Sequence, residues 1–185
     1  MNYIPLIFLS FFSFFANAAE ILSTVPKVDL DRYIGTWHEI ARFANKHQKD
    51  CVKTQAEYSY GDKPGNIIIK NKCSLSDGSE KQISGIAHVD DPTNAKLKIN
   101  FVPSWLRWLG IGWGNYWIIE LDDDYQYAVV SEPKKEYLWI LSRTPSMNKI
   151  IYAGLVSRLK DKGFDTANLI VSDQLNLPMT KVRGF

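Results

Sequence analysis

Alternation of apolar and polar residues recurs along the middle of this chain at intervals of roughly a dozen residues. Turn-forming clusters such as Gly61–Gly65 and Asp122–Asp124 separate the alternating segments. Because no helical periodicity intervenes, the pattern predicts one all-β antiparallel sheet, either a barrel or a sandwich. Eight strands can close into a barrel that holds one small ligand. The predicted strands are Thr36–Phe43, Val52–Tyr60, Asn66–Cys73, Lys81–Val89, Lys96–Val102, Tyr116–Leu121, Tyr125–Ser131 and Tyr137–Arg143.

A helical pattern follows the eighth predicted strand. Apolar residues between Ile150 and Leu159 fall mostly on one helical face, with Ser146 as the expected N-cap and Gly163 after the helix. The mixed charge of the polar face favours a helix packed on the outside of the sheet over one lying on a membrane. Leu169–Val171 is then expected to form a short last strand.

The first residues have the composition of a targeting segment. Ile4–Phe15 is an apolar run of twelve residues, shorter than the roughly 17–25 needed to span a bilayer. Ala16-Asn17-Ala18 supplies a small-x-small cleavage pattern, which predicts a signal peptide over 1–18 and one domain over 19–185. No Lys or Arg precedes the run, so an uncleaved interfacial anchor is the alternative. No cysteine lies near the cleavage point, so we expect a soluble periplasmic protein, with peripheral contact to the outer membrane as a further option.

Charge and cysteine content narrow the class further. The chain has 22 Lys and Arg against 20 Asp and Glu, and this net charge of +2 does not suggest a nucleic-acid binder. Export favours a disulfide between the two cysteines, Cys51 and Cys73. The strands around Gly61–Gly65 are predicted to pair about residue 62, which places the two cysteines opposite one another. A metal or thiol site is the rival interpretation, disfavoured because no histidine is close.

Three segments resemble the sequence signatures of the lipocalin family. They are Asp31–Phe43 with its Gly35-Thr36-Trp37, Asp124-Tyr125, and Tyr137–Pro145, and they resemble the subgroup of bacterial lipocalin (Blc) and apolipoprotein D. The resemblance covers the whole predicted domain, residues 19–185, which would remain after removal of the signal peptide. It implies an eight-stranded antiparallel up-and-down β-barrel with a C-terminal α-helix packed outside and a short ninth strand. It also implies binding and transport of a fatty acid or lysophospholipid, with a role in membrane maintenance. The bacterial lipoproteins of this group carry their lipid on a cysteine at the cleavage point, and this sequence has no cysteine there.

Up-and-down topology predicts which residues meet at each end of the barrel. The first strand begins, and the eighth ends, at the same closed end, so Arg143 is expected over Trp37, where a guanidinium on an indole contributes about 0.5–2 kcal/mol. The residues expected to form this structural closure are Gly35, Trp37, Asp124, Tyr125 and Arg143.

The opposite end carries four predicted rim loops, over 44–50, 74–80, 103–115 and 132–136. The third loop combines indoles with a cation, at Trp105, Arg107, Trp108 and Trp113. Such residues suit a membrane–water interface; a lid over the pocket or a contact in a homodimer are the alternatives.

Strand alternation predicts the lining of the barrel. Trp37 and Arg143 are taken to point into the barrel, which sets the inward-facing residues of the first and eighth strands. In the sixth strand, Tyr116 and Ile118 are predicted to point inward, with Trp117 and Ile119 as the competing face. In the seventh strand, the resemblance implies that Ala128 and Val130 point inward. Glu39 is expected to be a hydrogen-bonded structural carboxylate. The ligand head group is expected near the rim. The predicted ligand-contacting residues are Ala41, Phe43, Tyr58, Phe101, Tyr116, Ile118, Ala128, Val130, Trp139 and Leu141.

Nothing in the sequence indicates catalysis or a cofactor. His38, His47 and His88 are dispersed and have no Ser or Cys nucleophile as an obvious partner, and no phosphate-binding loop or metal-ligand cluster is present. We therefore predict a lipid carrier and not an enzyme. A carrier of haem, tetrapyrrole or isoprenoid pigment is the main alternative. A lipocalin-fold enzyme and an integral outer-membrane barrel are less favoured, the latter because most predicted strands fall short of about 9–11 residues.

Overall fold

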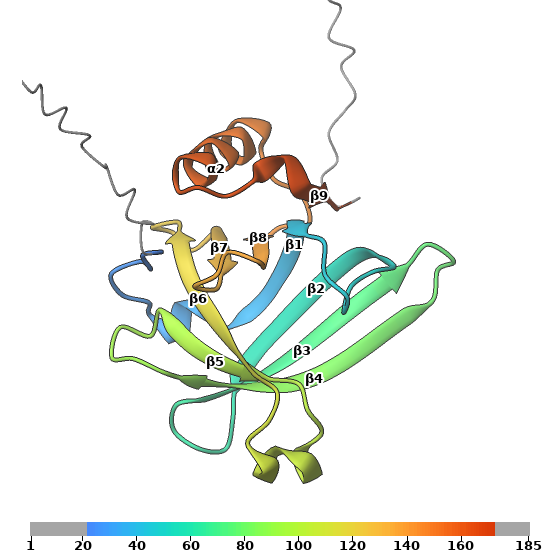
Figure 1. The fold of residues 1–185 in the computed structure, drawn as a ribbon, viewed down its shortest axis with the longest axis vertical. Coiled ribbons are helices and arrows are strands. Elements are labelled where there is room, and N and C mark those ends of the chain that lie inside the picture. The colour runs from blue at the N-terminus through green and yellow to red at the C-terminus, as the bar shows by residue number, and fades with distance from the viewer. Residues whose placement is uncertain (1–21, 173–185) are drawn as a thin grey trace, which may run out of the picture.

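A computed structural model describes residues 22–172, so the predicted signal peptide lies outside the described residues. Eight strands follow one another as the alternation predicts, and a ninth comes after the helix (Figure 1). Their bounds are β1 Gly35–Phe43, β2 Cys51–Tyr60, β3 Asn66–Leu75, β4 Glu80–Val89, β5 Lys96–Asn100, β6 Trp113–Leu121, β7 Tyr127–Ser131, β8 Leu138–Ser142 and β9 Leu169–Val171.

The sheet closes on itself as an up-and-down barrel. Each of β2 to β8 pairs with its neighbour in the chain, β8 pairs with β1, and β1 pairs with β2. Only the first half of β1, Gly35–His38, pairs with β2, whereas Ala41–Phe43 pairs with β9 on the same edge. The strands β1 and β2 therefore diverge toward the mouth of the barrel, and β9 covers the edge that β2 leaves.

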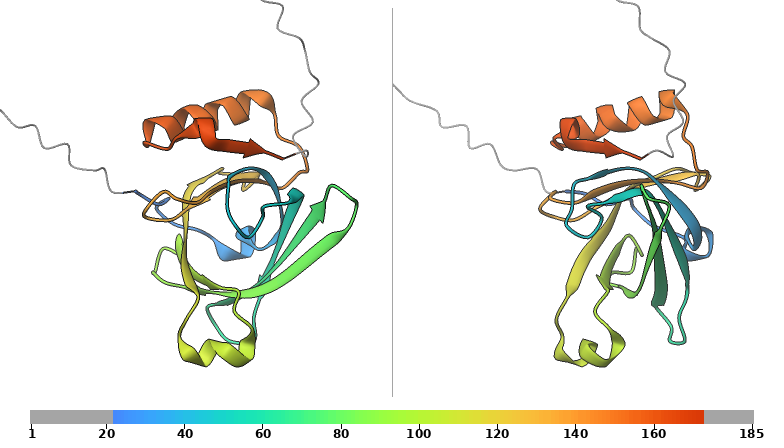
Figure 2. Two further views of the ribbon diagram at one scale, coloured as in Figure 1. Left: turned by 45° about the vertical axis from the view of Figure 1, so that its right-hand side comes forward. Right: turned by 90° about the vertical axis from the view of Figure 1, so that its right-hand side faces the viewer.

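The helix α2, Lys149–Asp161, packs outside the barrel together with β9 (Figures 1 and 2). Leu155 and Leu159 of α2 are fully buried against the outer faces of β1, β6, β7 and β8. The predicted N-cap Ser146 is wrong: Asn148 caps the helix, its side chain accepting a hydrogen bond from the Ile150 backbone N–H. A second apolar cluster lines the barrel interior, so the wall has an apolar layer on both sides.

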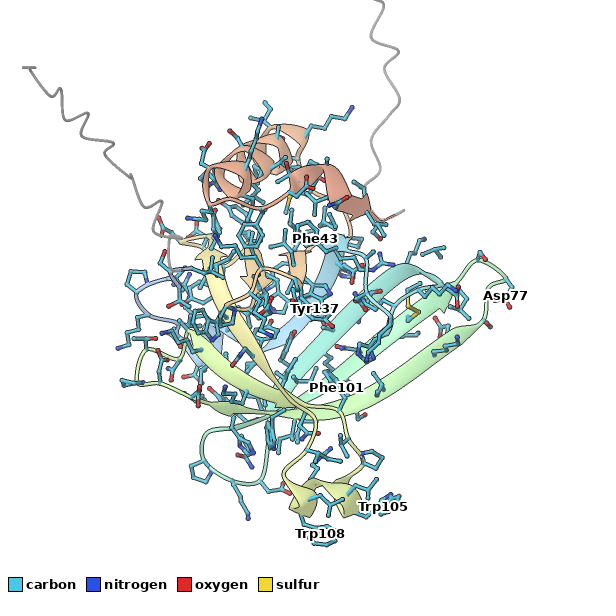
Figure 3. All side chains as sticks on the ribbon, viewed as in Figure 1. Phe43, Asp77, Phe101, Trp105, Trp108 and Tyr137 are labelled. Atoms are coloured by element: carbon cyan, nitrogen blue, oxygen red, sulfur yellow. A yellow bond between two sulfur atoms is a disulfide. The ribbon has the colours of Figure 1, made fainter. Side chains whose placement is uncertain are left out.

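A β-bulge in β1 overturns part of the predicted lining. Glu39 pairs with Leu141, but Ala41 pairs with Ile140, so one extra residue lies between these two pairs. The extra residue shifts the alternation by one position. Ala41 and Phe43, predicted to point inward, pack instead in the outer cluster beneath α2, and Figure 3 shows Phe43 on that side. Arg42 takes the register position opposite the inward-facing Trp139.

The predicted disulfide is confirmed, although the predicted register of its hairpin is wrong. Cys51 and Cys73 are bonded, with their Cα atoms 5.4 Å apart. Thr54 faces Cys73 and Cys51 faces Leu75, so the hairpin does not turn about residue 62. A bulge between Cys51 and Lys53 brings the two sulfur atoms together across a diagonal.

Three short helices lie in segments where no helix was predicted. The α1 turn, Leu30–Tyr33, precedes β1 and is capped by the Asp29 side chain. The 3₁₀-helix η1, Ser104–Leu109, lies inside the predicted aromatic rim loop, and a second 3₁₀-helix, Thr166–Asn168, precedes β9. All are too short for a helical periodicity to be recognised in the sequence.

Candidate ligand-binding site

The closed end of the barrel is sealed by Trp37 and Arg143. The guanidinium carbon of Arg143 lies 3.8 Å from the centre of the Trp37 ring, which is fully buried. The Arg143 guanidinium also donates hydrogen bonds to the carbonyl oxygens of Thr36 at 3.0 Å and Tyr33 at 3.1 Å. The indole N–H of Trp37 donates to the Tyr33 carbonyl at 2.8 Å. The Arg143 side chain therefore connects α1, β1 and the end of β8 at the closed end of the barrel.

Gly35 and Tyr125 complete this closure. Gly35 has φ = 98°, a backbone conformation that would strain any residue with a side chain. A Cβ added there would also lie only 3.3 Å from the Arg143 Nη1 atom and would crowd the guanidinium. Tyr125 accepts the Arg143 Nε–H on its carbonyl oxygen and stacks its ring under the Arg32 guanidinium. Asp124 lies at this end too, in the β6–β7 turn, where its carbonyl accepts a hydrogen bond from Gln126.

The inner wall contains the remaining predicted residues. Phe101 and Trp139 are half-buried and pack against the inner cluster, and Phe101 lies over Gly85, where a Cβ would come within 2.5 Å of its ring. The pairing of Ile118 with Val130 and of Ala128 with Leu141 continues this wall across β6, β7 and β8. The buried members are Tyr58, Tyr116, Ile118, Ala128, Val130 and Leu141.

Three tyrosine hydroxyls meet inside the barrel. The Tyr116 hydroxyl lies 2.8 Å from that of Tyr33 and 3.0 Å from that of Tyr58. Burial raises the pKa of all three phenols, that of Tyr58 to about 12, because the phenolate would lose its hydration. The cluster is therefore neutral at physiological pH and can serve as donor or acceptor.

Little free space remains around these tyrosines. A cavity of about 10 Å³, room for a single water, lies among the three rings and the side chains of β3, β4 and β5. Nearer the mouth the barrel is open. Ile83 shares the inner face with Asn71 and Ala56 through the strand register, yet it is 49% exposed. The inner face is therefore tightly packed around the tyrosines and accessible to solvent at Ile83, nearer the mouth.

A buried polar network occupies the β1 side of the mouth. The Gln48 side chain, from the loop after β1, donates to the Glu39 carboxylate at 2.6 Å and accepts from the Trp139 indole N–H at 2.9 Å. Arg42 pairs with Glu39 at 3.3 Å and donates to the Gln48 carbonyl at 2.8 Å. The loop over 44–50 is thus held inward. Sequence reasoning missed Arg42 and Gln48, since only the bulge turns Arg42 inward.

Glu39 has the structural role expected of it. It is 3% exposed, and burial raises the pKa of its carboxyl against the opposing effects of Arg42 and Gln48. Its oxygens are used by protein partners. The network fixes the loop on the β1 side of the mouth.

The predicted aromatic rim loop projects from the barrel on η1. Trp105 and Trp108 are 71% and 80% exposed, and both lie at the tip of the loop, away from the wall (Figure 3). Arg107 is partly buried and donates to the Val102 carbonyl, so it fixes the turn. Trp113 belongs to β6 and packs on the His88 ring with 5.0 Å between ring centres. The two most exposed indoles of the described chain are therefore those at the η1 tip.

The described residues contain no group of three His, Cys, Asp or Glu side chains arranged to hold a metal ion. In the same part of the chain, no helix has the length and apolarity needed to cross a membrane.

These features define a single-chain β-barrel closed at one end by a Trp–Arg plug and open at the other. A sequence model described as a lipocalin-like domain matches residues 28–174. Temperature-induced lipocalin-1 of Arabidopsis thaliana is 37% identical, with 85% of each chain covered. The outer membrane lipoprotein Blc of Vibrio cholerae is 34% identical, over 84% of this chain and 88% of Blc. Mouse apolipoprotein D is 30% identical, over 81% of this chain and 79% of its own. The chain belongs to the lipocalin family.

The fold is also that of solved lipocalin structures. Insecticyanin from the tobacco hornworm Manduca sexta superposes with a TM-score of 0.64 at 21% identity, covering 84% of this chain and 86% of the other. At this identity the likeness concerns the fold alone. The predicted family, its Blc and apolipoprotein D subgroup and the barrel architecture are confirmed.

Proposed function

We propose that this protein is a lipid carrier that holds one fatty acid or lysophospholipid in its barrel and performs no catalysis. The observation that carries the proposal is the apolar inner wall, which reaches from the tyrosine cluster to the half-exposed Ile83 near the mouth. Each methylene moved from water onto such a wall contributes about 0.8 kcal/mol. A single alkyl chain suits this space because the Gln48 network already occupies one side of the mouth.

Binding can be tested with a charge placed in the path of the alkyl chain. Ile83→Arg puts a guanidinium on the inner face at the mouth, where the side chain is half-exposed, so the fold should tolerate it. Ile150→Arg, on the exposed face of α2, is the matched control. We expect tryptophan fluorescence to change saturably with low-micromolar lysophospholipid in the unmodified protein and the control, and the affinity of Ile83→Arg to fall at least tenfold. No saturable change with any acyl lipid would refute the proposal.

The η1 tip supports a second part of the proposal, contact with a membrane surface during lipid exchange. Two exposed indoles beside the mouth match the preference of Trp for the lipid–water interface. Replacing Trp105 and Trp108 with Ser should weaken liposome association in a flotation assay and leave lysophospholipid binding in solution unchanged. Equal losses in both assays would instead identify the tip as a lid.

The cell envelope is the proposed location. The support is the similarity to proteins named outer membrane lipoprotein Blc, together with the predicted signal peptide. Fractionation of cells that express the full chain should recover a shortened protein with the periplasm. Full-length protein in the cytoplasm would contradict this part.

A further inference from the structure

Asn71 places a buried hydrogen-bond acceptor in the inner wall. It pairs with Ala56 on one side and Ile83 on the other, so its side chain belongs to the inward-facing row of β3. Its Oδ1 atom is buried, and it has no hydrogen-bond partner within residues 22–172. An acceptor left in this state destabilises a protein, and an apolar residue of the same size would avoid the penalty. The fold itself therefore gives no use for Asn71.

The tyrosine cluster has the complementary property. Three hydroxyls contribute three O–H donors, but only two hydroxyl–hydroxyl contacts join them. Each contact uses one hydrogen, so one O–H remains without an acceptor inside the described chain. Tyr58 faces Ile69, one inward position below Asn71, so Tyr58 and Asn71 are diagonal neighbours, about 7–8 Å apart.

The depth of the free space decides which end of a ligand reaches these groups. The cavity beneath is about 10 Å³, too small for any part of an alkyl chain. A ligand that enters from the mouth would therefore stop above the tyrosine rings, near Asn71, which follows Ile69 in the same inward row of β3. A methyl end there would itself offer no partner to the spare O–H or to the Asn71 oxygen. A polar end would pair with both.

We propose that Asn71 and the tyrosine cluster form a polar subsite that binds the neutral, hydroxyl-bearing end of a long-chain lipid. A hydroxyl donates to the Asn71 oxygen and, like an ester carbonyl, accepts the spare tyrosine O–H; a monoacylglycerol carries all of these groups. An ionised carboxylate can only accept. Among the described residues, Arg143 is engaged by backbone carbonyls, and Arg42, in the Gln48 network at the mouth, is paired with Glu39 and keeps only its Nε–H without a partner. The alkyl chain then runs toward the mouth past Ile83, opposite to the expected placement of the head group at the rim.

This inference rests on the proposed function, so its test must separate the two. Calorimetry on the full mature chain would compare monolauroylglycerol with laurate, which has the same acyl chain. We expect the monoacylglycerol to bind about tenfold more tightly. Asn71→Leu should lower its affinity about tenfold and leave that of laurate unchanged. Asn115→Leu, on the outer face of β6, is the control and should change neither. Asn71→Val is the second variant if the leucine does not fit.

Two further readouts exclude a merely structural role. Without ligand, Asn71→Leu should melt at a higher temperature, because it removes the unpaired oxygen. A dodecyl chain carrying a fluorophore at its methyl end should bind about tenfold more tightly than one carrying it at the hydroxyl end. Equal affinities for the two lipids, or no effect of either Asn71 variant, would overturn the subsite and leave the lipid carrier standing. Failure of every acyl lipid to bind would overturn both.

Discussion

Removing Arg143 tests whether the closed end holds the barrel together. Its guanidinium covers the Trp37 ring at 3.8 Å and donates to four backbone carbonyls, those of Arg32, Tyr33, Thr36 and Tyr125. The cation–π contact contributes about 1 kcal/mol. Water partly replaces the hydrogen bonds at this half-buried site, so we assign about 0.5 kcal/mol to each. Arg143→Ala should therefore lower the free energy of unfolding by about 3 kcal/mol.

Urea unfolding followed by circular dichroism measures this loss. Arg143→Lys should retain about half of the contribution, because an ammonium can stay near the indole but cannot reach all the carbonyls at once. Arg158→Ala is the control: that side chain pairs with Glu120 at 2.8 Å but is 47% exposed, and such pairs contribute about 0–1 kcal/mol. If Arg143→Ala costs no more than Arg158→Ala at an unchanged m-value, the reasoning about the plug is wrong.

Two further predictions concern the mouth and the hairpin. Burial raises the pKa of Glu39, so the folded protein binds that proton more tightly than the unfolded chain; relative to Glu39→Gln, the unmodified protein should lose stability as pH rises from about 4.3 through the raised pKa. Urea unfolding between pH 4 and 7 checks this, and a pH-independent difference would contradict it. Replacing both Cys51 and Cys73 with Ala should lower the free energy of unfolding by about 3 kcal/mol, because the bridge closes a loop with a sequence separation of 22; a loss below 1 kcal/mol would argue against a constraint on the unfolded chain.

Strand identity could be predicted because it depends on local patterns, and the resemblance to lipocalins implied that the strands close into a barrel. Alternation with a period of two marked the eight strands, and the up-and-down order alone placed Arg143 over Trp37. The inward row of β6 was also assigned correctly, with Tyr116 and Ile118 inside and Ile119 outside. Where strand pairing is regular, knowing that one side chain points into the barrel determines which other side chains of that strand point inward.

Bulges account for most of what could not be predicted. An extra residue in β1 turned Ala41 and Phe43 outward and brought Arg42 toward the interior, and no composition signal marks that position. The turn after Tyr60 set the register of the hairpin, since Tyr60 faces Ile67, and a bulge near Cys51 then brought the disulfide partners together. Gln48 is a polar loop residue in the sequence, and its role follows only from the way its loop folds into the mouth. Asn71 likewise becomes notable only once its neighbours are known to be apolar.

Native mass spectrometry of the purified full chain tests the central claim most directly. We predict that a fraction of the protein carries one bound lipid with a single acyl chain, and that incubation with excess lysophospholipid or monoacylglycerol converts the rest to a one-to-one complex. Protein that stays free of lipid after purification, and also after incubation with each of these lipids, would contradict a ligand-binding barrel.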